Sequence, residues 1–280
     1  MPGILYLVPT PIGNLGDISQ RIAQTLQDAD FIAAEDTRVS LKLLNHLGLK
    51  KPLISYYRHN TAAGGQQVLD RLLSGESCAL VTDAGTPAIS DPGEDLVALC
   101  AENGVTVIAV PGPCALVTAL AVSGLPTGRF TFEGFLAMNK KNRKVHLESL
   151  REETRTMIFY EAPHKLLSTL LDLQETFGSL RRISLCRELS KLHEEVVRTT
   201  LGDAAKKYGE TPPKGEFVLV VEGCAPTAPA EVTPEEALEA VSALREQGLS
   251  LKDAVRQVSI SLKMPKNKLY DCAIAAESDP

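Results

Sequence analysis

The chain has 280 residues, of which 44% are hydrophobic, and it carries a formal net charge of -6 with a pI near 5.5. This length is enough for two medium-sized domains, each with its own hydrophobic core. The acidic balance excludes a protein that binds nucleic acid through its bulk charge. An RNA partner would have to meet local basic patches instead.

Cysteine usage and the N-terminus indicate a reducing compartment. The six cysteines are scattered, with no C-x-x-C pair and no histidine cluster at metal-ligand spacing, so the sequence predicts no metal site and no disulfide. The first residues, MPGILYLVPTPIG, lack a basic leader region, and no apolar run approaches the roughly 18 residues that span a membrane. We therefore expect a cytoplasmic protein.

Short apolar runs alternate with longer helix-period stretches through the first part of the chain. This alternation predicts an α/β domain over residues 1–112, built on a parallel sheet with crossover helices. The expected strands cover residues 4–8, 31–34, 53–55, 78–81 and 105–110. The expected helices cover residues 19–28, 38–47, 62–74 and 93–103.

The sequence VPGP at 110–113 marks a hinge, because its two prolines cannot join a strand ladder. An apolar helix is expected over 114–123. The second α/β domain, residues 113–224, has fewer clear crossover helices between some of its strands, which favours a mixed sheet. Its expected strands lie near residues 130–135, 156–161, 182–187, 195–200 and 216–222.

Proline-rich small residues mark 225–234 as a semi-rigid linker to a helical module at 235–280. Three short helices are expected in this module, similar to a helix-turn-helix unit. The signals for their starts are the capping-box pair Thr233 and Glu236 around Pro234, then Ser250, then residues 264–268.

Basic residues gather in three places, each suited to contacts with phosphate. The alternative in each case is an ordinary solvated surface, loop or exposed helix start. The candidate RNA-binding residues are Arg58 in a loop, Lys140, Lys141, Arg143 and Lys144 after a strand, and Lys252, Arg256, Lys263, Lys266 and Lys268 in the C-terminal module.

Small or polar loops follow several expected strands, and in open parallel sheets ligands bind at these strand ends. No motif for dinucleotide oxidoreduction, NTP hydrolysis or serine hydrolysis is present. The most informative segment is 80–93, where a buried strand runs into a small-residue loop and then a helix. In it Asp83 offers a carboxylate, and Gly85 allows close approach of the backbone to a ligand.

The sequence EDTR at 35–38 holds two carboxylates and a guanidinium directly behind a buried strand. One interpretation is substrate positioning or proton removal by Glu35 or Asp36. The alternative is structural: Asp36 caps the following helix and Glu35 pairs with Arg38.

Two polar corners of the second domain also follow expected strands. Tyr160 and Glu161 end one strand, and His164 follows them in a first helical turn, where a histidine often only meets solvent or a neighbouring acid. Lys191 belongs to a cluster of mixed charge behind another strand.

Taken together, these loops resemble the tetrapyrrole methylase superfamily of S-adenosylmethionine (SAM) enzymes, and specifically its ribosomal branch. The resemblance covers nearly the whole chain. Members that act on tetrapyrroles carry G-x-G-P-G-D and G-G-D-P where this chain has residues 9–14 and 84–87, which favours the ribosomal branch. The motifs that carry it are LVPTPIGNL at 7–15, AEDTR at 34–38, TDAGTP at 82–87, VPGP at 110–113, YEAPH at 160–164 and GEFVLV at 215–220.

The resemblance implies two α/β domains with SAM in the cleft between them, working as a homodimer. It also implies methylation of the 2′-oxygen of a cytidine ribose in small-subunit ribosomal RNA. By position in the family pattern, the cofactor contacts are Pro9, Asp83, Ala84, Gly85, Thr86, Ile89, Cys114, Ala115, Tyr160 and Glu161.

A ribose hydroxyl is a weak acid, so a nearby group must take its proton late in the reaction. The candidates are Glu35, Asp36, Glu161 and Lys191. Our hypothesis is that Asp36 and Arg38 order the nucleotide, while Glu161 or Lys191 lies closer to the reacting oxygen. Two other functions stay open: a methyltransferase for a small tetrapyrrole-like or other anionic molecule, and a non-catalytic RNA-binding protein on a SAM-binding fold.

Overall fold

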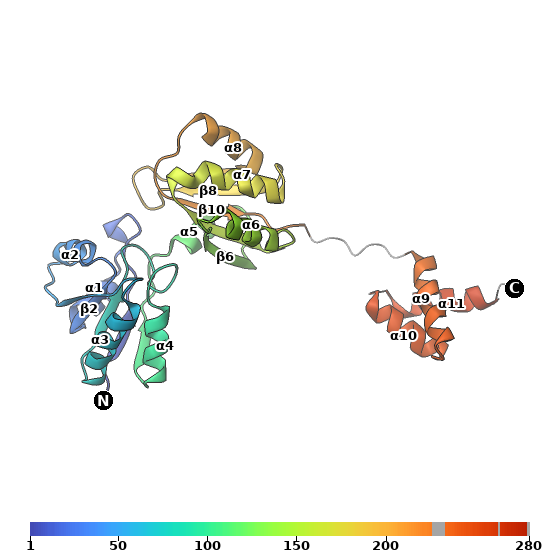
Figure 1. The fold of residues 1–280 in the computed structure, drawn as a ribbon, viewed down its shortest axis with the longest axis horizontal. Helices are drawn as coiled ribbons and strands as arrows, with labels where there is room; N and C mark the ends of the chain where they lie inside the picture. The colour runs from blue at the N-terminus through green and yellow to red at the C-terminus, as the bar shows by residue number, and fades with distance from the viewer. Residues whose placement is uncertain (226–232, 263, 279–280) are drawn as a thin grey trace. The chain divides into compact units, whose positions relative to one another are not determined.

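Short apolar strands pair into two five-stranded sheets in the computed structural model, which describes residues 1–225, 233–262 and 264–278. The chain divides into two compact units, Met1–Cys224 and Ala225–Pro280, and both sheets belong to the first unit (Figure 1). That residues 1–112 and 113–224 behave as separate domains stays a prediction.

The first sheet is parallel throughout and has the strand order β3-β2-β4-β1-β5. The predicted parallel sheet is therefore confirmed, and each predicted strand matches within one residue at either end. Its strands are β1 (Ile4–Leu7), β2 (Phe31–Ala34), β3 (Leu53–Ser55), β4 (Cys78–Val81) and β5 (Thr106–Ala109).

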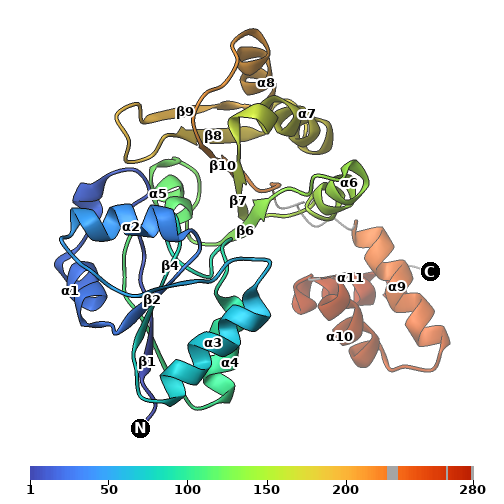
Figure 2. The same cartoon turned by 60° about the vertical axis from the view of Figure 1, so that its left-hand side comes forward.

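Helices cover both faces of this sheet, because β2 and β4 are buried at every position and need apolar partners on each side. One apolar cluster joins the sheet to α3 and α4, and another joins it to α1 and α2; Figure 2 shows these pairs on opposite sides. The helices are α1 (Gln20–Asp28), α2 (Thr37–His46), α3 (Thr61–Leu73) and α4 (Glu94–Glu102), with a 3₁₀ turn η1 (Leu15–Asp17) before α1.

The second sheet has the order β6-β7-β10-β8-β9, with β6 and β7 parallel and the other neighbours antiparallel. The predicted mixed sheet is confirmed. Helices α6, α7 and α8 pack on one face, and the apolar helix α5 packs on the other. The elements are α5 (Ala115–Val122), β6 (Phe130–Phe135), α6 (Lys140–Ser149), β7 (Thr156–Glu161), η2 (Pro163–Lys165), α7 (Leu166–Phe177), β8 (Arg182–Arg187), β9 (Glu195–Thr200), α8 (Leu201–Glu210) and β10 (Phe217–Val221).

The second unit is a three-helix module with its own small core of Ala237, Val241, Val255 and Leu269 among others. It contains α9 (Pro234–Glu246), α10 (Leu251–Ser261) and α11 (Lys266–Ser278). The predicted capping box at the start of α9 is present, and Ser250 caps α10 as expected. Among the described residues, no helix combines the length and apolar character needed to cross a lipid bilayer.

We predict that Leu219→Ala lowers the free energy of unfolding by about 2–5 kcal/mol, because it leaves a cavity in a packed core. Leu219 lies in the middle of β10, pairs with Phe159 and Leu185, and is fully buried. Urea unfolding measures the loss. The matched control is Leu180→Ala, since Leu180 is 86% exposed; equal losses for the two variants would contradict this account of the core.

Candidate active site

A cavity of about 510 Å³ opens in the first unit where loops of the first sheet meet the second sheet. Both its size and its mixed apolar and polar wall are typical of small-molecule sites. Its wall consists of Ile12, Glu35, Thr82, Asp83, Ala84, Gly85, Thr86, Ile89, Ser90, Asp91, Cys114, Ala115, Phe135, Tyr160, Glu161, Ala162, Pro163, Cys186, Leu189, Lys191, Glu216, Phe217 and Val218.

The loop between β4 and α4 forms one side of this cavity. It is held against the loop after β1 by two backbone hydrogen bonds, from Thr10 N to Gly85 O (2.9 Å) and from Gly85 N to Thr10 O (3.0 Å). Gly85 has a φ of 88°, which only glycine adopts readily. The Thr86 hydroxyl donates to the carbonyl of Pro113 (2.9 Å), so the loop is also fixed to the segment that leads into α5.

The same loop contains two strained residues. Ala88 and Ser90 have φ values of 66° and 67°, in the left-handed region that costs non-glycine residues about 1–3 kcal/mol each. Such conformations persist only where the surroundings impose them, and they cluster at functional sites. The β8–β9 loop across the cavity has the same feature at Glu188 and Ser190, with φ values of 50° and 67°.

Tyr160 forms the opposite wall and fixes the start of α5. Its hydroxyl accepts a hydrogen bond from Leu116 N (3.1 Å), and its ring meets Phe132 and Phe135 edge-on. Burial, with a smaller contribution from Cys114, raises the pKa of Tyr160 to about 12, so it stays a neutral phenol. The wall here is therefore rigid and largely apolar.

The carboxylates after β2 divide between two tasks. Glu35 accepts a hydrogen bond from the buried hydroxyl of Thr82 (2.7 Å) and lines the cavity. Asp36 caps α2 and pairs with Arg38 (2.6 Å), and the hydrogen bonds from Arg38 lower the pKa of Asp36 to about 2. The structural alternative was thus right that Asp36 is the cap and wrong about Glu35, because the partner of Arg38 is Asp36.

Glu161 and Lys191 both reach the cavity from the second sheet, and both already have partners. Glu161 is buried and accepts hydrogen bonds from the hydroxyl of Thr169 and from Ala162 N (2.8 Å). Lys191 donates to Glu188 and Glu216, each at 2.9 Å. Burial lowers the pKa of Lys191, but these hydrogen bonds outweigh it, so the pKa lies above its usual value and the ammonium stays protonated.

The cavity brings together most of the residues that the sequence indicates. Of the predicted cofactor contacts, nine line it, and Pro9 does not: it is buried beside Gly112, where an added Cβ would come within 2.9 Å of the Pro9 Cβ. Of the predicted catalytic residues, Glu35, Glu161 and Lys191 line it, while Asp36 and Arg38 stay outside its wall. Sequence reasoning missed Asp91 and Glu216, although Asp91 lies in the segment 80–93 and Glu216 in the motif at 215–220.

The predicted RNA-binding residues of the first unit differ in what they touch. Arg143 is a correction: it is buried and held by Asp172 (2.6 Å) and Thr169 (3.0 Å), so its guanidinium supports the packing of α6 on α7. Lys140, Lys141 and Lys144 are exposed at the start of α6. Arg58 lines a second cavity, next to the first.

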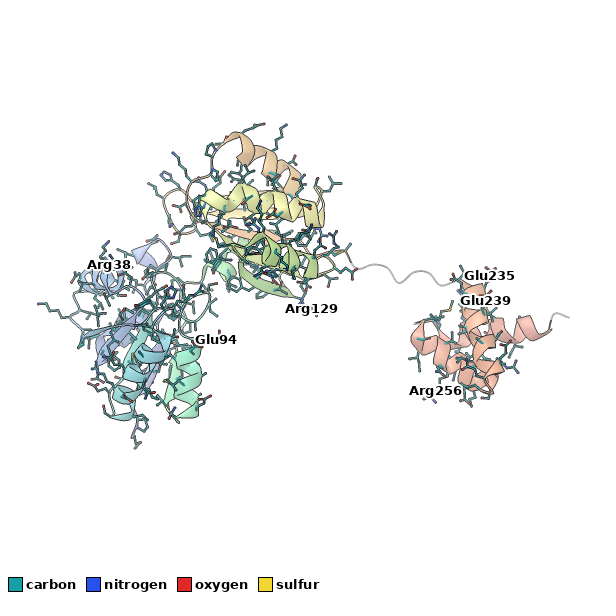
Figure 3. The ribbon with its side chains drawn as sticks, viewed as in Figure 1. Arg38, Glu94, Arg129, Glu235, Glu239 and Arg256 are labelled. Carbon is teal, nitrogen blue, oxygen red and sulfur yellow. The ribbon has the colours of Figure 1, made fainter. Side chains whose placement is uncertain are left out.

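In the second unit the described basic residues are exposed, and Figure 3 shows Arg256 on α10 with Glu235 and Glu239 on α9. Lys252 lies on α10 with Arg256, and Lys266 and Lys268 lie in the first turn of α11. Lys263 lies outside the described residues.

We compared the chain with models of protein families and with known proteins. The model for Tetrapyrrole (Corrin/Porphyrin) Methylases matches residues 4–205. The chain belongs to the tetrapyrrole methylase family. It is 48% identical over 277 residues to the Ribosomal RNA small subunit methyltransferase I of Synechocystis sp., covering 99% of both chains. It is 46% identical to the protein of that name from Halalkalibacterium halodurans, covering 96% of this chain and 94% of the other.

Several solved structures share the fold of this chain at low sequence identity. Diphthine synthase has a TM-score of 0.61 at 15% identity, covering 79% of this chain and 90% of its own. A uroporphyrin-III C-methyl transferase from Thermus thermophilus, complexed with S-adenyl homocysteine, has a TM-score of 0.55 at 17% identity, covering 79% and 97%. The predicted two-sheet methylase fold is therefore confirmed.

We predict that Gly85→Ala destabilises the protein by about 1–2 kcal/mol, because an alanine must take up the left-handed backbone conformation at this position. The new methyl group would also lie 3.4 Å from the Ile12 Cγ2 atom in the cavity wall. Thermal unfolding measures the effect. Gly128→Ala is the matched control, since that glycine has nothing within 4 Å of an added Cβ; no difference between the variants would contradict the strain.

Proposed function

We propose that the protein transfers a methyl group from SAM to the 2′-oxygen of a cytidine ribose in small-subunit ribosomal RNA. The observation that carries this proposal is the 48% identity over 99% of both chains with a Ribosomal RNA small subunit methyltransferase I. The choice of the cytidine 2′-oxygen as the methylated atom rests on the resemblance of the motifs to the ribosomal branch of the family.

The charge of the cavity supports a cationic ligand such as SAM, whose sulfonium and ammonium groups outnumber its one carboxylate. Five acidic residues line the cavity: Glu35, Asp83, Asp91, Glu161 and Glu216. Within the described part of the chain, Lys191 is the cationic side chain of this wall. The excess of carboxylates attracts a positive ligand through the low-dielectric interior.

The backbone of Ala84, Gly85 and Thr86 would hold the donor, with Ile89 and Val218 as apolar walls. The donor supplies an electrophilic methyl group that needs no further activation. The task of the protein is then alignment of the ribose oxygen and exclusion of water. The rigid loop between β4 and α4, fixed at Thr10 and Pro113, suits that task because little freedom is left to lose on binding.

The sequence candidates for proton removal are not equally suited. Lys191 is protonated and cannot accept a proton, and Asp36 is committed to Arg38. Lys191 is better suited to positioning the two carboxylates that it binds. Asp36 and Arg38, which lie outside the cavity wall, suit a contact with the RNA at its rim.

The acidic cavity also weighs against the alternative of an anionic small-molecule substrate. A tetrapyrrole with several carboxylates would have to enter beside five carboxylates that face the same space. The RNA phosphates meet the same obstacle and must stay outside. Recognition is proposed to fall to Lys140, Lys141 and Lys144 and to the basic residues of α10 and α11, in a homodimer in the cytoplasm.

The proposal is tested with purified protein, isotope-labelled SAM and small ribosomal subunits from cells that lack this protein. We expect label in the small-subunit RNA, on one cytidine, at a position that resists alkaline cleavage because its 2′-oxygen is blocked. Calorimetry measures the affinity for SAM separately. Label on a base instead of a ribose would overturn the assignment of the oxygen, and absence of SAM binding would overturn the proposal as a whole.

We predict that the double variant Lys252→Glu/Arg256→Glu of the full chain binds small subunits at least about tenfold more weakly. A plot of log binding constant against log salt concentration should also become less steep, by about one unit of slope for each lost phosphate contact. SAM affinity stays unchanged, since α10 is outside the unit that contains the cavity. The matched control, Lys42→Glu/Lys50→Glu on the first unit, changes the net charge equally. Equal weakening in the control would mean that bulk charge, not this helix, attracts the RNA.

A further inference from the structure

A second, smaller cavity of about 250 Å³ adjoins the large one. The two cavities share Ser90 and Asp91 in their walls. The smaller wall also contains Arg58 and Thr61 from the segment before and at the start of α3, and Glu94 and Asp95 from the start of α4. Hydrogen-bond acceptors dominate this space, so it suits a group rich in hydroxyl and amino donors better than a phosphate.

Asp91 stands where the two spaces meet. The backbone next to it is held in the strained conformation of Ser90, and Gly93 follows with a φ of 150°. Of the acidic residues in the large wall, Asp91 is the one that also faces the smaller cavity. A ligand in either space can therefore lie beside Asp91.

Other carboxylates at the large cavity are already engaged. Glu35 accepts from Thr82 (2.7 Å), Asp83 accepts from Asp36 N (3.2 Å), and Glu161 accepts from Thr169. Glu216 pairs with Lys191 (2.9 Å). A carboxylate that accepts from fixed donors loses those contacts on protonation, which opposes proton uptake. Burial and repulsion from Glu35 also raise the pKa of Asp83, but Asp83 lines the large cavity alone.

The surroundings of Asp91 favour proton uptake. Burial raises the pKa of Asp91 to about 6, the nearby Thr82 hydroxyl, which donates to Glu35, opposes the rise, and repulsion from Glu35 and Asp83 adds to it. Arg58 lowers it slightly, and Glu94 and Asp95 face the same small cavity. A base with a pKa just below neutral pH is ionised and still basic enough to receive a proton.

We propose that the target ribose enters the smaller cavity and that the Asp91 carboxylate takes the proton from the hydroxyl that is methylated. This inference rests on the proposed function and names a catalytic residue that the sequence did not indicate. The ribose O–H bond breaks and its proton passes to Asp91, while the oxygen forms the new bond to the methyl carbon. The carbon–sulfur bond of the donor breaks, and its electron pair stays on the sulfur.

The test compares Asp91→Asn with Asp83→Asn, the same change in a carboxylate that lines the large cavity alone. For Asp91→Asn we expect kcat to fall at least about 100-fold, with the affinity for small subunits within about threefold of the original. The affinity for SAM should fall far less than kcat, since four other carboxylates remain in the wall. For the original protein we expect the rate to fall tenfold per pH unit below about pH 6. This loss should be absent in Asp91→Asn. It should remain in Asp83→Asn even if that variant binds SAM more weakly.

A readout independent of catalysis is thermal stability. An acid whose pKa is raised on folding destabilises the folded state above its folded pKa, and the penalty vanishes below its unfolded pKa. Asp91→Asn should therefore raise the Tm at pH 8, and the gain should shrink as the pH falls toward 4.5. A lower Tm at pH 8 would mean that Asp91 holds the fold, and this would overturn the proposal.

A second variant, Thr61→Tyr, places a larger side chain in the smaller cavity and leaves residue 91 as aspartate. It should raise KM for small subunits at least about tenfold and leave SAM affinity unchanged. Normal KM in this variant, or a normal kcat and acid limb in Asp91→Asn, would sink the inference about Asp91 while leaving 2′-O-methylation by the original protein intact. If the original protein transfers no methyl group to ribose, the proposed function itself fails.

Discussion

The two backbone hydrogen bonds between Thr10 and Gly85 are the constraint on which the site depends. They join the loops that follow β1 and β4, which are neighbours in the parallel sheet, and they do so at the sheet edge where ligands bind. With the bond from Thr86 to Pro113, the loops after three neighbouring strands of the sheet, β4, β1 and β5, act as one rigid wall. A backbone surface of this kind can approach a ligand closely because Gly85 has no side chain in the way.

Acidic and basic side chains lie in different places, so the proposed binding of a cationic donor and the proposed binding of RNA do not interfere. The cavity wall is acidic, and exposed lysines lie at the start of α6 and on the second unit. If basic side chains for phosphate binding lined the cavity itself, they would repel a cationic donor and draw phosphates into the space where the reaction is proposed to occur. Under the proposed function, this separation also accounts for how a chain with a formal net charge of -6 would bind an anionic RNA.

The sequence predicted the strands, the mixed second sheet and the loops that line the cavity. These features depend on the spacing of apolar residues and on the residue types in turns, which can be seen within a short stretch of chain. Sequence reasoning failed where a side chain finds its partner far along the chain. Arg143 reads as part of a basic run, but α7 brings Asp172 to it, and nothing near residue 143 indicates this. Asp91 was passed over for the same reason: its importance comes from Glu35, Asp83 and the second cavity, which only the fold assembles.

The two sheets are joined firmly on one side of the cavity and loosely on the other. On the firm side, α5 packs its apolar residues into the core of the second sheet, and Tyr160 fixes its first turn. On the loose side, the half-buried Ser190 donates its hydroxyl to Asp17 (2.6 Å), the stem of Lys191 lies against Gly13, and Ile12 packs against the cluster that contains Leu189. A hydrogen bond to a carboxylate contributes about 1.5–3 kcal/mol, less than the burial of several apolar side chains on a packed helix. The bond between Ser190 and Asp17 therefore adds less to the attachment of the two sheets than the packing of α5 does.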